Sequence, residues 1–265
     1  NPWGAAREAA MAAAPAPTID WQQLQLEQQL GEGASGVIHR ALYRHDGGAE
    51  AVAVKLYKGV MTSDGSPLNE MSACLNVGAN PKLVPVLGRL TGHPDGTNGL
   101  VMPLIDPAFI NLAGPPSFAS CTRDVYEDDK RFAWSHVLSI AHGVASAAAQ
   151  LHAHGVLHGD LYAHNIVHNA AGHSLLGDFG AAAFYDPASP MAKALQRLEV
   201  RAFGLLLEEL LSRTDECTGA GEKTAASTTK RELLRELQVA CSSEDIAARP
   251  LFEGIARKLQ TIRQD

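Results

Sequence analysis

The sequence predicts an α+β protein, with strands in its N-terminal part and helices in its C-terminal part. Three observations support this prediction. Alternating and β-branched segments occur between Leu24 and Ile105. Further along, residues 132–154 and 199–211 carry apolar side chains typical of helices. Finally, 265 residues with 46% hydrophobic content are enough for one large domain or a bilobed pair with a sizeable core.

Composition narrows the class of protein. The net charge of −7 argues against a nucleic-acid partner and against adhesion to an anionic membrane. The four cysteines are scattered without a C-x-x-C pair, so we expect a reducing, cytoplasmic location. No apolar run approaches the length of a bilayer span. Because the chain starts with Asn1 rather than Met, it is compatible with a longer protein that extends before residue 1.

The N-terminal half begins with an Ala- and Pro-rich stretch, residues 1–17, which we interpret as a disordered tail or linker. An alternating segment from Leu24 then leads into Gly31, Gly33 and Gly36. The residues after Gly36 are typical of a strand, which puts the glycines at a hairpin tip, whereas a Rossmann loop would enter a helix. Glycines at such a tip let backbone amides approach phosphate oxygens.

The next segments are expected to alternate between strands and one helix. A β-branched strand ends at Lys55, and Glu70 lies on a helix that follows the Asp64-Gly65-Ser66 breaker. We assign residues 18–105 to the N-terminal lobe.

The C-terminal lobe, residues 106–265, opens with a loop-rich insertion at 106–131 that we interpret as mainly solvated and acidic. A strong helix spans 132–154 and a Leu-rich helix follows Glu199. A Thr-, Ser- and Gly-rich loop is expected at 212–229, before a helix from Leu233 to Cys241.

The most informative stretch is His158-Gly-Asp-Leu-Tyr-Ala-His-Asn165, followed by Asp178-Phe-Gly180. Apolar pairs flank a turn between them, which predicts a β-hairpin with Asn165 opposite Asp178. An amide oxygen and a carboxylate so placed suit Mg²⁺. Asp160 is then the candidate that orients and deprotonates an attacking hydroxyl.

These motifs, H-x-D-x-x-x-x-N and D-F-G, resemble those of the protein kinase superfamily. The glycine hairpin, the V-A-V-K strand ending at Lys55 and the Arg-Pro-Leu-Phe segment at 249–252 add to the likeness, the last in the tyrosine-kinase-like style. The resemblance runs from about residue 19 to 265 and implies the bilobed protein-kinase-like fold, with a small β-rich N-terminal lobe and a larger helical C-terminal lobe. It also implies two further strands, at residues 80–88 and 99–105.

The resemblance also implies a function, phosphoryl transfer from Mg·ATP to a protein hydroxyl, serine or threonine in preference to tyrosine. Asp160 would be the catalytic base, with Lys55 held by Glu70, and Asn165 with Asp178 would bind Mg²⁺. The implied nucleotide-binding residues are Gly31, Gly33, Gly36, Ile38, Ala53, Lys55, Met102, Pro103, Ile105 and Val167.

The chain departs from the family pattern at four places. Gly159 replaces the arginine of H-R-D, which in the family contacts a phosphorylated activation segment. The segment from Asp178 to Glu199 is unusually short and contains no A-P-E, so Arg249 lacks the glutamate with which it would ordinarily pair. We therefore expect activity without activation-segment phosphorylation, and a protein substrate held by the 106–131 and 212–229 regions. Tyr162 replaces a lysine, and we expect it to pack rather than line an acceptor pocket.

Two alternatives stay open. The His-Gly-Asp sequence also resembles the corresponding motif of small-molecule phosphotransferases of the aminoglycoside and choline kinase type, which share the fold. A nucleotide-binding pseudokinase scaffold with little turnover is the other. The six histidines between residues 152 and 173 match no zinc spacing, so metal ligation by histidine is not expected.

Overall fold

The computed structural model describes residues 17–33, 35–59, 67–121, 123–214 and 225–264. The expected tail lies outside these ranges except for its last residue. The chain forms two compact units. The first contains the described residues up to Asp106 together with His154–Asp160 and Asp178–Asp186, and the second contains Pro107–Ala153, Leu161–Gly177 and the described residues from Pro187 onward. A β-sheet N-terminal region and a helical C-terminal region confirm the predicted α+β class.

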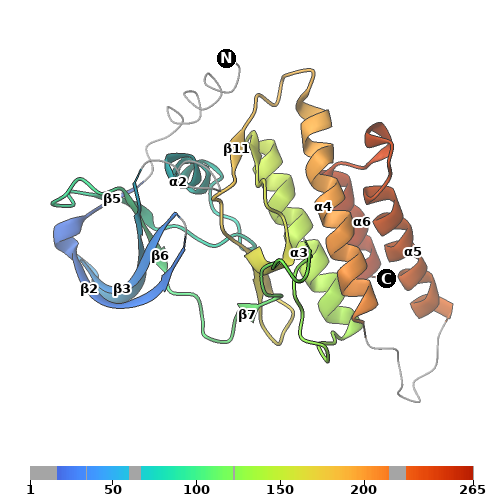
Figure 1. Ribbon diagram of the computed structural model, residues 1–265, viewed down its shortest axis with the longest axis horizontal. Helices are drawn as coiled ribbons and strands as arrows, with labels where there is room; N and C mark the ends of the chain where they lie inside the picture. Colours follow the sequence, from blue (N-terminus) through green and yellow to red (C-terminus); the bar gives the residue numbers. More distant parts are fainter. Residues whose placement is uncertain (1–16, 34, 60–66, 122, 215–224, 265) are drawn as a thin grey trace. The chain divides into compact units, whose positions relative to one another are not determined.

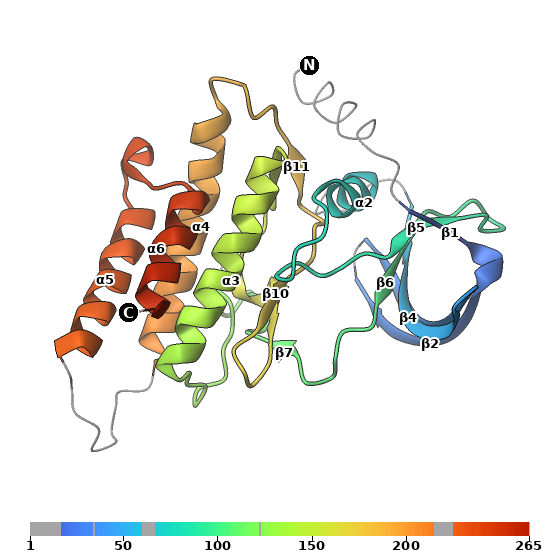
Figure 2. The same ribbon diagram turned by 180° about the vertical axis from the view of Figure 1, so that it is seen from behind.

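The first unit is built on a six-stranded sheet with the order β1-β5-β6-β4-β3-β2 (Figure 2). β1 pairs with β5 in parallel, and the other neighbours are antiparallel. The strands are β1 (Thr18–Asp20), β2 (Leu24–Glu32), β3 (Gly36–His45), β4 (Gly48–Tyr57), β5 (Gly88–Thr91) and β6 (Gly99–Pro103). The unit also holds helix α2 (Pro67–Asn76) and a two-stranded sheet of β8 (Val156–Leu157) and β11 (Ala183–Phe184).

The two faces of the six-stranded sheet carry different residues because side chains alternate along each strand. One face holds an apolar cluster around Ala41, Val52 and Val54, which is completed by Trp21 and Tyr43 at its margin. The other face bears Tyr57 and Leu100, which pack against Met71 of α2. Helix α2 therefore lies on the face that also carries Lys55.

The strand expected at residues 80–88 is wrong in its position. Residues 84–87 have no regular secondary structure, and β5 starts only at Gly88. Pro81 and Pro85 explain the difference, since neither residue can donate a backbone hydrogen bond to a sheet. The strand expected at 99–105 is present as β6, and it ends at Pro103.

The second unit is mainly helical, and Figure 1 shows its helices lying side by side. Its long helices are α3 (Trp134–Ala153), α4 (Ala192–Ser212), α5 (Ala225–Cys241) and α6 (Phe252–Gln264). A small sheet of β7 (Ile110–Asn111), β9 (Ile166–His168) and β10 (Ser174–Leu176) completes it. α3 packs on α6 and α4, and α4 packs on α5. None of the helices within the described ranges is long and apolar enough to span a bilayer.

Two helix boundaries differ from the prediction. α4 begins at Ala192, seven residues before Glu199, because the intervening sequence Ala-Lys-Ala-Leu-Gln-Arg-Leu consists of strong helix formers. α5 already begins at Ala225, inside the loop expected at 212–229, and α4 includes Ser212. Residues 215–224 of that loop lie outside the described part of the chain.

Candidate functional site

The first unit contains a buried ion pair between Lys55 and Glu70. Lys55 lies on β4 and Glu70 in the first turn of α2, and their side chains are 13% and 4% exposed. Lys55 Nζ donates to Oε1 of Glu70 and lies 5.2 Å from the centre of the Tyr57 ring. The second oxygen, Oε2, is buried without a hydrogen-bond partner among the described residues. A half-satisfied buried carboxylate calls for a functional explanation.

Strand register places further predicted nucleotide-binding residues on the face that carries Lys55. Ile38 of β3 lies directly opposite Lys55, and Met102 of β6 lies opposite Ala53. Directly opposed residues share a face, and so do residues two apart on one strand. Ile38, Ala53, Lys55 and Met102 therefore form one continuous surface of the sheet.

The glycine hairpin connects β2 to β3, as the sequence predicts. A side chain built at Gly31 or Gly33 would meet open space, so these two positions leave the backbone accessible. Gly36 has a different reason to be glycine, because a Cβ there would lie 2.6 Å from the carbonyl oxygen of Leu56. Close packing of neighbouring strands accounts for this third glycine.

The remaining predicted nucleotide-binding positions fall at the end of β6 and in the second unit. Pro103 is the last residue of β6 and lies opposite Val52, and Ile105 follows it with 39% of its surface exposed. Val167 is the middle residue of β9 and belongs to the second unit.

The segment around Asp160 is shaped by the residues before it. The His158 side chain is fully buried, its ring lies 5.2 Å from that of Phe179, and its Nδ1 accepts from the Asp160 amide at 3.3 Å. Gly159 has φ +82°, a left-handed conformation that side chains rarely adopt. A Cβ at this position would overlap the carbonyl oxygen of Ala181. Steric overlap therefore excludes an arginine side chain at position 159, and its absence also removes a positive charge.

Asp178 is one of two described non-glycine residues with positive φ, at +56°. Its Oδ1 accepts from the amide of Gly180 at 3.1 Å, and its residue surface is exposed. The next side chain, Phe179, is buried. Strained backbone held in this way is typical of functional sites.

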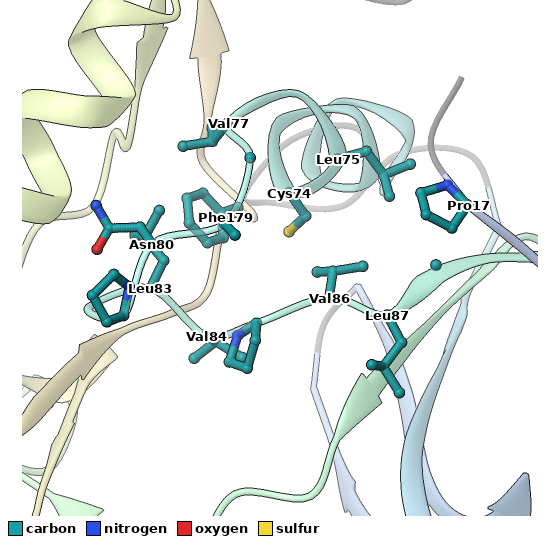
Figure 3. Close-up of a pocket in the computed structure, with 15 residues that line it drawn as sticks. Pro17, Cys74, Leu75, Val77, Asn80, Leu83, Val84, Val86, Leu87 and Phe179 are labelled. Carbon is teal, nitrogen blue, oxygen red and sulfur yellow. The ribbon is translucent and has the colours of Figure 1, made fainter. Parts of the chain in front are cut away.

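Phe179 lines an apolar cavity of about 440 Å³ in the first unit. Figure 3 shows its ring beside Val77 and Cys74, near the end of α2. Burial raises the pKa of the Cys74 thiol well above its ordinary value, and the negative charge of Glu70 adds to the shift. Phe179 forms part of the wall of this cavity, and none of the predicted nucleotide-binding residues lines the cavity.

The hairpin around Asn165 is present, but its register differs from the prediction. β9 and β10 pair with Ile166 opposite Leu176, and the amide of Gly177 donates to the carbonyl of Asn165 at 3.0 Å. Asn165 is thus opposite Gly177, and Asp178 is the next residue along the chain. The turn sets this register, because the Asn169 side chain accepts from the amides of Ala171 and His173 and closes a five-residue connection.

Sequence reasoning missed the role of Asp124 in the second unit. Its side chain is only 3% exposed and accepts from the His164 amide at 3.0 Å, while its other oxygen lies 2.8 Å from Nδ1 of the same histidine. The solvated interpretation of the acidic insertion holds for the exposed Glu127–Asp129 but is wrong for Asp124. No local sequence pattern predicts the contact of Asp124 with His164, because the two residues are 40 positions apart.

Tyr162 packs against a neighbouring ring, as predicted, and also lines a cavity. It is 39% exposed, its ring stacks on that of His164 with 9° between the planes, and it lines a second cavity of about 170 Å³.

Arg249, near the C-terminus, is buried and donates to the carbonyls of Ser243 and Arg197, at 2.7 and 3.0 Å. These carbonyls provide partners for the arginine in a chain without A-P-E.

Within the described ranges, no three side chains of His, Cys, Asp or Glu lie close enough together to hold a metal ion. Glu199 instead lies 2.7 Å from Nε2 of His152, deep between helices of the second unit.

Comparison with known proteins identifies the family. The sequence profile of the family described as "Protein tyrosine and serine/threonine kinase" matches residues 24–203, which is more than half of the chain. The chain belongs to this protein kinase family.

Three curated relatives are named as serine/threonine kinases. A probable cyclin-dependent serine/threonine-protein kinase of Dictyostelium discoideum is 27% identical over 68% of this chain and 26% of its own length. The serine/threonine-protein kinase PkaA of Streptomyces coelicolor is 33% identical over 61% of this chain and 30% of its own. A probable LIM domain-containing serine/threonine-protein kinase of D. discoideum is 22% identical over 89% and 38%. The chain thus covers well under half of each relative.

Proposed function

We propose that this protein transfers the γ-phosphoryl group of Mg·ATP to a hydroxyl of a protein acceptor, serine or threonine in preference to tyrosine. The observation that carries the proposal is the buried Lys55–Glu70 pair on the sheet face that also bears Ile38, Ala53 and Met102. A carboxylate that fixes a lysine beside an apolar surface suits a nucleotide, with its base on the surface and its phosphates at the cation. The names of the three relatives support the choice of serine or threonine.

In this proposal, Asp160 accepts the proton of the acceptor hydroxyl. The hydroxyl oxygen forms a bond to the γ-phosphorus while the bond to the bridging oxygen of ADP breaks. Lys55 holds the other phosphates, and the open backbone at Gly31 and Gly33 leaves room for phosphate oxygens beside the hairpin. Catalysis is then mainly positioning and neutralisation of charge.

The chain offers suitable ligands for Mg²⁺ in Asp178 and Asn165. Both supply the hard oxygen donors that this ion prefers. The amide of Gly180 uses only one of the roughly four acceptor sites of the Asp178 carboxylate. A bound Mg²⁺ would neutralise charge on the transferring phosphates.

We further propose that activity does not require phosphorylation of the segment after Asp178. Ala181 lies directly over Gly159, and Phe184 of β11 is already paired with β8. Tyr185 is only 4% exposed, and the Ser189 hydroxyl accepts from the Met191 amide just before α4. These contacts support a segment held in place by packing, without a phosphate.

A cytoplasmic location is part of the proposal. The three cysteines within the described ranges, Cys74, Cys121 and Cys241, form no disulfide, which suits a reducing compartment.

The test is a phosphorylation assay with [γ-³²P]ATP that offers casein and a panel of amino-alcohols side by side, using phosphatase-treated protein. We expect labelled casein from the wild type, and for Asp160→Asn a loss of about 10²- to 10⁴-fold in rate with little change in ATP affinity. Labelled amino-alcohols without labelled protein would support the small-molecule alternative, and no transfer to either would support a scaffold. Loss of activity on phosphatase treatment would contradict independence from phosphorylation.

A further inference from the structure

The turn that carries Asn165 has few hydrogen bonds of its own. It is a one-turn 3₁₀ helix, Ala163–Asn165, in which the Asn165 amide donates to the carbonyl of Tyr162 at 3.2 Å and the Ile166 amide donates to that of Ala163. Tyr162 is the N-cap residue, and its side chain makes no capping hydrogen bond. The first amides of a helix need acceptors from outside it, and a short 3₁₀ turn has poor hydrogen-bond geometry. The turn therefore depends on an acceptor from elsewhere in the chain.

Asp124 supplies that acceptor from the 106–131 insertion. Its Oδ2 accepts from the backbone amide of His164, the second residue of the turn, at 3.0 Å, and its Oδ1 lies 2.8 Å from the ring Nδ1 of the same histidine. The side chain of Asp124 is 3% exposed and that of His164 is 18% exposed. A carboxylate that accepts from an amide in the first turn is the usual N-cap interaction. Asp124 thus provides the cap that Tyr162 does not.

The residues on both sides of this aspartate are fixed to other parts of the second unit. Arg123 and Tyr126 both donate to the carboxylate of Glu209 on α4, each at 3.1 Å. Val125 exchanges two backbone hydrogen bonds with Gly114, at 2.8 and 2.9 Å. Because its neighbours are held in this way, the capping carboxylate is presented to the turn by an ordered segment and not by a free loop.

We propose that Asp124 is a positioning residue for catalysis, which caps the turn and thereby holds Asn165 where its amide oxygen can bind Mg²⁺. The inference rests on the metal-binding role proposed for Asn165 and adds the residue that orients it. Outer partners of metal ligands determine metal affinity because they fix the direction of the ligand. The Gly177 amide, which donates to the carbonyl of Asn165 at 3.0 Å, holds the same residue from the β10 side.

The first measurement needs no nucleotide. Amide hydrogen exchange, followed by NMR at His164, should be about tenfold faster in Asp124→Ala, because the amide loses a hydrogen bond to a charged group. The amides of α6 should exchange at the wild-type rate, which would show that the fold is intact. Unchanged exchange at His164 would overturn the proposal, and so would an equal acceleration in α6, since the effect would then be a general loss of stability.

The second measurement is the Mg²⁺ concentration that gives half-maximal binding of the non-hydrolysable ATP analogue AMP-PNP. Asp124→Ala should raise this concentration at least about tenfold, the usual effect of removing an outer partner of a metal ligand. The affinity for AMP-PNP in EDTA should stay at the wild-type value. A defect of the same size with and without Mg²⁺ would contradict a role through Asn165.

Three further variants complete the test. Asp124→Asn keeps an oxygen for the His164 amide and should return both quantities to within about threefold of wild type, since asparagine caps as well as aspartate does. His164→Ala removes the ring contact alone, should raise both quantities about threefold, and decides the question if Asp124→Ala does not fold. Asp129→Ala removes the same charge from an exposed position of the insertion and should behave as wild type. An effect of Asp129→Ala as large as that of Asp124→Ala would show that the charge of the insertion matters and not the cap.

The two proposals can fail separately. Binding of AMP-PNP that does not depend on Mg²⁺ in the wild type would contradict the proposed function, and hydrogen exchange would still test the cap at His164. Binding that depends on Mg²⁺ in the wild type and to the same extent in Asp124→Ala would contradict only the role of Asp124.

Discussion

Each unit of the molecule buries a glutamate beside a nitrogen base, and the two pairs are arranged differently. Lys55–Glu70 lies on a sheet face, keeps 13% of the lysine exposed and leaves Oε2 of Glu70 without a hydrogen-bond partner among the described residues. His152–Glu199 lies between α3 and α4 with both side chains below 8% exposure, and the His152 ring packs edge-on against Phe252 at 5.1 Å. The lysine of the first pair is partly accessible, whereas the second pair is enclosed by helices.

This difference indicates what each pair contributes. A buried pair is not in itself strongly stabilising, because desolvation offsets the attraction between its members. An accessible lysine with an incompletely bonded partner is suited to a negatively charged ligand, whereas an enclosed pair can only fix the packing of helices. We therefore expect loss of Lys55–Glu70 to affect catalysis and loss of His152–Glu199 to affect stability.

The largest expected effect comes from Lys55→Met combined with Glu70→Gln. The double variant removes the proposed phosphate-binding cation without leaving a buried charge alone, so the fold should survive. The rate of casein phosphorylation should fall at least about 10²-fold, since a fixed charge at the transferring group is lost. The measurement is the initial rate with [γ-³²P]ATP beside a urea unfolding curve. Normal turnover in this variant would remove the basis of the proposed site.

The second expected effect concerns stability. Glu199→Ala should lower the free energy of unfolding by about 1–3 kcal/mol, because Nε2 of the buried His152 loses its hydrogen bond to Glu199. Replacing both members with leucine, His152→Leu and Glu199→Leu, should recover most of that loss, and the folded double variant should phosphorylate casein at nearly the wild-type rate. Urea denaturation measures the first quantity. A stable double variant without activity would show that Glu199 serves catalysis, which would contradict the comparison.

Some of the side-chain contacts in this structure could be predicted from the sequence, and others could not. The Lys55–Glu70 contact could be expected because a family resemblance supplied both positions, and the strand pattern placed Lys55 next to a glycine hairpin. The contact of Asp124 with His164, and that of Arg123 with Glu209, could not be expected. They join an irregular insertion to residues 40 and 86 positions away, and neither periodicity nor a motif encodes such pairs.

Local chemistry explains the boundaries that the sequence placed wrongly. The early start of α4 follows from the helix propensity of residues 192–198, which carry no apolar stripe as strong as the Leu-rich run after Glu199. The shifted partner of Asn165 follows from the Asn169 side chain, which fixes an odd-length turn and moves the register by one residue. At Gly159 the sequence indicates a lost charge, and the folded chain adds the carbonyl of Ala181, which excludes a side chain.

The smallest expected effect comes from a third buried base, His168 on β9, which has no carboxylate beside it among the described residues. It is 6% exposed, and its ring lies edge-on to Phe132 at 5.7 Å. Burial lowers the pKa of His168 below its ordinary value of about 6.5, and the positive charge of Lys130 adds to the shift.

A lowered folded-state pKa means that the unfolded chain binds the proton first as the pH falls. Stability is therefore unaffected by His168 above about pH 6.5 and decreases as the pH falls below it, by at most about 1.4 kcal/mol per pH unit for one proton. His168→Leu should reduce the difference between the free energies of unfolding at pH 7.5 and pH 5.5, measured in urea. His173→Leu, on the exposed side of the same hairpin, is the matched control and should leave that difference unchanged. If His168→Leu retains the full wild-type difference, other groups cause the loss of stability at low pH. In that case, the lack of a carboxylate partner does not make His168 more sensitive to acid than the enclosed His152–Glu199 pair.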